Sequence, residues 1–101
     1  MVRRSAEKIQ HIGMILPTIV KRAARRHATL SLVQRRWGRL VGVELAKHTK
    51  PVTLRRGQLV VQVDQPGVSF VLSYERARLV ERLRHATKGT VNDVVIRPGD
   101  V

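Results

Sequence analysis

The stretch Leu30–Asp64, LSLVQRRWGRLVGVELAKHTKPVTLRRGQLVVQVD, decides the fold because its hydrophobic period changes part of the way along. Its first half has apolar residues at steps of three and four, namely Leu30, Val33, Trp37, Leu40, Val41 and Leu45. That spacing indicates one buried face of an α-helix. Pro51 cannot continue a helix, so we expect the helix to end near Lys50.

Beyond Pro51 the period of the apolar residues becomes two, which is typical of β-strands. Arg56-Gly57 separates two such runs and is expected to form the turn of a β-hairpin. The residues predicted to face the core are Val52, Leu54, Leu59, Val61 and Val63. We therefore predict a long helix followed by a hairpin that packs on its apolar face.

The N-terminal segment, residues 1–27, is predicted to be helical and basic. Gly13 and Pro17 predict a kink, or a second helix with Pro17 in its first turn. Its apolar stripe, which continues through Ile19, Val20 and Ala23, is expected to pack on the core. Residues 28–31 are expected to connect it to the central helix, with Thr29 or Ser31 as the N-cap.

Helical spacing returns from Val68 to about Thr87, and Lys88-Gly89 is expected to end that helix through a left-handed glycine. Residues 91–98 then predict a short strand, which must join the hairpin because an isolated two-stranded sheet is barely stable. The fold class is therefore α+β in the order α-α-β-β-α-β. Its three-stranded sheet is covered on one face by helices, in the outline of small KH-like domains. One domain, 1–101, has its core at 28–98.

Charge is the strongest compositional signal: 20 Lys and Arg against seven Asp and Glu give a net charge of +13. Such an excess favours a polyanionic partner, with nucleic acid as the first candidate and an anionic membrane or acidic protein second. The chain has no cysteine, which suits the reducing cytoplasm. No apolar run approaches the roughly 20 residues needed to span a membrane.

The candidate nucleic-acid-binding side chains lie in three segments. They are Arg22, Arg25, Arg26, Arg35, Arg36, Arg39, Lys47, Lys50, Arg55 and Arg56. Those on the central helix are expected on the side away from Trp37, where they form either a solvated face or a strip that tracks phosphates. The sequence leaves both interpretations open.

Five further residues are predicted to be structural. Trp37 is expected to anchor the core, and Pro51 to stop the helix. Gly38 and Gly42, one turn apart, each cost about 1 kcal/mol in a helix, so we expect another backbone to approach them closely. His48 is expected to satisfy the helix C-terminus with Glu44 as its partner.

No catalytic, metal or cofactor site is predicted. The carboxylates are scattered, the histidines lack metal-ligand spacing, and no nucleophile–base pair or phosphate-binding glycine loop is apparent.

Three motifs in order resemble the bacterial DciA-type domain: WGRLVG (37–42), LAKHTKP (45–51) and GQLVVQV (57–63). The similarity runs from about Leu30 to Arg97. It implies a KH-like domain that binds the DnaB-type replicative helicase and assists its loading on single-stranded DNA. Val68 departs from the family pattern, since it stands where a bulky aromatic residue is usual. The GxxG loop that clamps nucleic-acid backbone in true KH domains is absent as well.

The expected function is a non-enzymatic, nucleoid-associated adaptor in replication initiation, of undetermined oligomeric state. Its grip on single strands would be electrostatic and salt-sensitive. Two alternatives stay open from the sequence. One is an RNA-binding or ribosome-associated protein, and the other is a protein-interaction module that uses the open sheet face around Val60.

Overall fold

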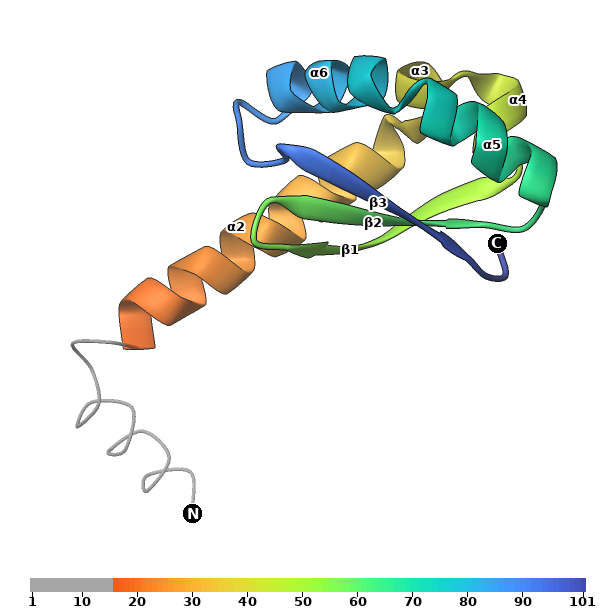
Figure 1. Ribbon diagram of the computed structural model, residues 1–101. Coiled ribbons are helices and arrows are strands. Elements are labelled where there is room, and N and C mark those ends of the chain that lie inside the picture. The colour runs from red at the N-terminus through yellow and green to blue at the C-terminus, as the bar shows by residue number, and fades with distance from the viewer. Residues whose placement is uncertain (1–15) are drawn as a thin grey trace.

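The computed structural model describes residues 16–101, and their elements confirm the α+β class (Figure 1). The helices are α2 (Leu16–Arg35), α3 (Trp37–Val41), α4 (Val43–Ala46), α5 (Pro66–Tyr74) and α6 (Arg76–Ala86). The strands are β1 (Thr49–Arg55), β2 (Gln58–Val63) and β3 (Asp93–Pro98). The predicted first piece of the N-terminal helix, around Gly13, lies outside the described residues. No helix among residues 16–101 is long and apolar enough to cross a membrane.

The three strands form one mixed sheet in the order β1-β2-β3. β1 and β2 pair antiparallel through a two-residue turn, in which Arg56 and Gly57 have φ values of 52° and 80°. Two positive φ values are typical of the type I′ turn that matches strand twist. β3 runs parallel to β2, and α5 and α6 make the crossover that a parallel pair requires. The predicted hairpin and joining strand are confirmed.

The helices cover one face of the sheet, as predicted, and the core lies between that face and the helices (Figure 1). Its buried residues are Val33, Trp37, Leu54, Leu59, Val61, Val63, Leu72, Leu79, Leu83, Val91 and Val94. The opposite face carries half-buried side chains, including those of Thr53, Val60 and Val95. That face is open to solvent.

One inward residue of the hairpin was predicted wrongly. The register of β1 shifts between Pro51, which pairs with Val61, and Thr53, which pairs with Val60. Val52 is therefore the extra residue of a β-bulge and is only half-buried, while Pro51 is buried. The Pro51 carbonyl accepts a hydrogen bond of 3.0 Å from Gln34 Nε2, which ties the bulge to α2.

The predicted connection at residues 28–31 is wrong, because α2 passes through it without a break. Thr29 and Ser31 lie inside the helix and are not N-caps. No glycine or proline lies between Thr18 and Arg35, so nothing stops the helix there. Pro17 does lie in the first turn, as predicted.

The N-terminal half of α2 does not pack on the core, contrary to prediction. Residues 18–28 are all exposed, and Ile19 and Val20 expose 52% and 57% of their surface. A helix of 20 residues is about 30 Å long, whereas a strand of six or seven spans about 20 Å. The helix therefore extends past the end of the sheet, as Figure 1 shows.

The single central helix expected from Leu30 to about Lys50 is instead divided into three. α2 ends at Arg35, and Gly42 separates α3 from α4 with a φ of 93°. The predicted close approach of another backbone to Gly38 and Gly42 is also wrong. Among residues 16–101, no atom beyond the glycine's own helix and chain neighbours lies within 4 Å of a Cβ placed on either residue. Gly42 is needed for its left-handed backbone, and Gly38 has no such requirement.

These two glycines should therefore respond oppositely to alanine. Gly38→Ala is expected to stabilise the chain by about 0.5–1 kcal/mol through helix propensity. Gly42→Ala is expected to destabilise it by roughly 1–3 kcal/mol, because the Gly42 backbone, with φ 93° and ψ 150°, lies in a region that only glycine adopts readily. Urea unfolding followed by circular dichroism measures both. Equal losses of stability would contradict the assignment.

Side-chain contacts join α3, α4 and the residues that follow α4 to the sheet. Trp37 is 5% exposed and its Nε1 donates to Thr49 Oγ1 at 2.8 Å, which confirms it as a core anchor. Thr49 Oγ1 donates in turn to the Leu45 carbonyl at 2.7 Å. His48 pairs through Nδ1 with Asp64 Oδ1 at 3.1 Å. Its partner is thus not Glu44, because Asp64 leaves β2 directly opposite the start of β1.

The predicted helix from Val68 to Thr87 is also divided, at Glu75, into α5 and α6. No glycine or proline lies near Glu75, so no local signal marks the break. The end of α6 follows the prediction: Lys88 and Gly89 have φ values of 53° and 86°. The Gly89 amide donates to the Arg84 carbonyl at 2.8 Å.

Candidate nucleic-acid interface

A cleft of about 480 Å³ lies between the projecting half of α2, the hairpin turn and the loop before β3. Its lining combines four arginines with three small or apolar residues. The lining residues are Ile19, Arg22, Arg25, Arg26, Arg56, Gly57 and Thr90. Arginines from two distant parts of the sequence thus line one space.

Local structure explains why these arginines converge. Arg22, Arg25 and Arg26 are three and four residues apart on α2, which puts them on neighbouring positions of one helix face. Arg56 lies at the tip of the hairpin. The amides of Asn92 and Asp93 both donate to the Gly57 carbonyl, at 2.9 and 3.2 Å, and hold the loop before β3 against the turn.

The carboxylates lie elsewhere. Within residues 16–101, the acid–base pairs are Lys47–Glu44, His48–Asp64, Arg76–Asp93, Arg78–Glu75 and Arg84–Glu81. None of these pairs includes an arginine of the cleft. Four like charges around one space repel each other, so an anion in the cleft would be favourable. The planar guanidinium also matches phosphate oxygens through paired hydrogen bonds.

The other predicted residues lie on different surfaces. Arg35, Arg36 and Arg39 are exposed around the junction of α2 and α3. Lys47 is paired with Glu44 at 3.4 Å. The register places Lys50 opposite Gln62 and Arg55 opposite Gln58, on the open face of the sheet. Four of the ten predicted residues therefore line the cleft, and the other six do not.

Ile19 and Thr90 line the cleft but were not among the predicted site residues. Ile19 was assigned to the core by its helical spacing. Thr90 reaches the cleft because β3 begins beside the hairpin turn, a result of its parallel pairing with β2. The sequence carries no local signal for strand direction, so no reading of residues 88–92 would have found it.

Among residues 16–101, no group of His, Cys, Asp or Glu side chains is placed to hold a metal ion. The cleft offers guanidinium donors, a hydroxyl and an apolar contact, which suit binding of an anionic chain more than bond-making chemistry.

The fold and its surface thus define a small α+β domain with helices, a three-stranded mixed sheet and a concentrated positive charge. The chain belongs to the DciA family: the family described as Dna[CI] antecedent, DciA, matches residues 11–96. This confirms the resemblance and extends it through α2. A comparison with curated proteins gave no match.

Family membership supplies the general role. DciA proteins are non-enzymatic operators or loaders of the replicative helicase in the initiation of DNA replication. Membership implies a DnaB-type helicase as the partner. The matched region includes every residue that lines the arginine cleft.

Proposed function

We propose that the chain holds single-stranded DNA in the arginine cleft while it acts with the DnaB-type helicase, in the cytoplasm at the nucleoid. The observation that carries the proposal is the convergence of four arginines on one space that no carboxylate side chain of residues 16–101 lines. A strand laid across the cleft would exchange its counterions for these guanidiniums.

The contacts available in the cleft favour binding without sequence preference. Arginine reads phosphates through charge and geometry, and phosphate contacts carry no sequence information. Trp37 is buried with its Nε1 engaged, so it offers no stacking surface. Thr90 adds a hydroxyl and Ile19 an apolar surface for a sugar or base. The strand would be held along its backbone with its bases largely unread.

Such a hold would assist loading by proximity. A strand tethered beside the helicase meets the ring at a high effective concentration, and the second binding event becomes intramolecular. The expected signature is cooperative assembly, in which single-stranded DNA and the helicase each raise the affinity of the chain for the other.

The salt dependence of oligonucleotide binding tests the proposal. If each of the four arginines neutralises one phosphate, the log–log slope against salt should be about −2.8, at about −0.7 per phosphate. Fluorescence anisotropy with pyrimidine and mixed-sequence strands measures it, and the two strands should bind equally. A slope near zero would remove the phosphate mechanism. Much tighter binding to RNA of equal length would favour the RNA alternative.

A further inference from the structure

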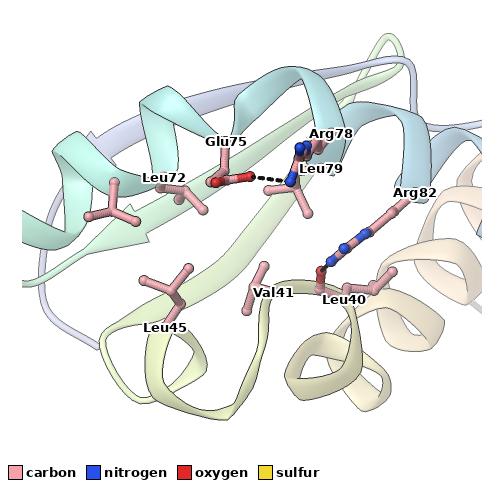
Figure 2. Close-up of a pocket in the computed structure, with 9 residues that line it drawn as sticks. Leu40, Val41, Leu45, Leu72, Glu75, Arg78, Leu79 and Arg82 are labelled. Carbon is pink, nitrogen blue, oxygen red and sulfur yellow. Dashed lines mark hydrogen bonds and ion pairs between the residues drawn. The ribbon is translucent and has the colours of Figure 1, made fainter.

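An apolar groove lies between α3–α4 and α5–α6 (Figure 2). It encloses about 200 Å³ and is lined by Leu40, Val41, Leu45, Val71, Leu72, Glu75, Arg78, Leu79 and Arg82. Six of these side chains are aliphatic, while the three polar ones come from α6 and the residue before it. The groove shares no lining residue with the arginine cleft.

The apolar surface continues from the groove over α5. Val71 is 43% exposed, and its helix neighbours Phe70 and Tyr74 are 74% and 82% exposed. Phe70 and Tyr74 are four residues apart and Val71 and Tyr74 three apart, so the three lie together. Two of the chain's three aromatic side chains are therefore in solvent beside an apolar groove. Aromatic side chains are enriched at protein–protein interfaces.

The charged residues at the groove give it a positive edge. The Arg78 side chain is 80% exposed and lies 3.9 Å from Glu75, the outer limit of an ion pair. Arg82 Nη1 donates to the Leu40 carbonyl at 3.0 Å, which joins α6 to α3 and places its charge at one end of the groove (Figure 2). A bound partner with carboxylates at these positions would be favoured.

We propose that this groove and the adjoining α5 surface dock an amphipathic helix of a partner protein, with acidic residues beside its apolar stripe. A helix of this kind buries residues at i, i+3, i+4 and i+7 in such a groove. Charge complementarity selects an acidic partner. A second copy brings a net charge of +13, and residues 1–15 carry Arg3, Arg4 and Lys8 against Glu7, so both have the wrong sign.

This docking site is separate from the arginine cleft. Its test rests on the proposed function in one respect, because the binding partner used as the probe is the intact DnaB-type helicase of the same organism. Val71→Glu is expected to weaken helicase binding at least about tenfold, as burial of a hot-spot residue predicts. Glutamate has a higher helix propensity than valine, so α5 should keep its fold. The control Val101→Glu alters a valine of similar exposure, 49%, outside the groove, and should bind normally.

A double variant in α5 and a charge-reversal variant with its control test the groove further. Phe70→Ser with Tyr74→Ser should weaken helicase binding while leaving the affinity for single-stranded DNA unchanged. Arg78→Glu should weaken helicase binding more than Arg84→Glu, which changes the same charge outside the groove. Calorimetric titration of each full-length variant with the helicase gives the affinities, and circular dichroism checks that each variant is folded.

Several outcomes would overturn the inference. Normal helicase binding by folded Val71→Glu and Phe70→Ser/Tyr74→Ser would show that the helicase docks elsewhere. Loss of DNA binding in the aromatic variant would make α5 a base-stacking surface. A wild-type dimer that Val71→Glu converts to a monomer would make the occupant a second copy. Failure of the wild-type chain to bind helicase at all would refute the adaptor role itself, which is a separate result.

Discussion

Replacing Arg22, Arg25 and Arg26 together by glutamine is expected to lower the affinity for single-stranded DNA about 100-fold at 0.1 M salt. The figure follows from counterion release: each phosphate contact contributes about 0.7 to log K per decade of salt below 1 M, so three contribute about 2. Glutamine keeps the helix propensity of arginine, and these positions are exposed. Stability should therefore change little.

A matched variant distinguishes DNA binding in the cleft from DNA binding by the overall positive charge of the chain. Arg35, Arg36 and Arg39 are also exposed and also carry three positive charges, but they lie outside the cleft. Their replacement by glutamine should cost much less affinity, because long-range attraction is largely screened beyond about 10 Å at 0.1 M salt. Equal losses in the two triple variants would mean that charge alone, without the cleft, accounts for binding.

Replacing Trp37 by alanine is expected to destabilise the fold by about 3–5 kcal/mol, the usual cost of removing a large buried aromatic side chain. In a domain of this size the melting temperature should fall by 10 °C or more, at about 4–8 °C per kcal/mol. Trp37 is the chain's single tryptophan, so its fluorescence is lost with it. Circular dichroism should follow the unfolding instead.

The hydrogen bond from Trp37 can be tested separately through its acceptor. Thr49→Val preserves the shape of the side chain but removes the oxygen that accepts from Trp37 Nε1. The buried indole N–H would then have no partner, at a cost of about 1–3 kcal/mol. Thr49→Ser keeps the hydroxyl and should cost clearly less. Equal stability of the valine variant and the wild type would show that the bond contributes nothing.

Hydrophobic period and turn chemistry predicted much of this fold. The alternation from Leu59 to Val63 gave the correct inward face, since a strand with one buried face tolerates no other register. Arg56-Gly57 gave the turn, and Lys88-Gly89 the end of α6. These features depend on neighbouring residues only, and local physical chemistry is sufficient to predict them.

The wrong predictions concern features that are determined by contacts between residues distant in the sequence. Gly42 looks like an interior helix residue until its positive φ is known. Ile19 is exposed because α2 is longer than the strands of the sheet. The residues near Ile19 in the sequence do not indicate that difference in length. The candidate interface also depends on distant contacts. The helical spacing of Arg22, Arg25 and Arg26 is visible in the sequence. Their proximity to Arg56 and Thr90 depends on how α2 packs and on the direction of β3, and neither is visible there.

The arrangement also separates two kinds of recognition on one small domain. Arginines gather where α2 extends past the sheet, and exposed apolar side chains gather on α5, beside the groove. A DciA protein that used both could contact DNA and helicase at once without competition between them. The two proposals predict that variants in one surface leave the other activity unchanged.

The most direct test of the central claim is the salt dependence of single-stranded DNA binding in the two arginine variants. For the variant in Arg22, Arg25 and Arg26, the slope should become shallower than the wild-type value by about 2, because about 0.7 is lost with each phosphate contact. The slope for the variant in Arg35, Arg36 and Arg39 should stay at the wild-type value. Identical slopes in both variants would contradict the assignment of the cleft as the DNA-binding site.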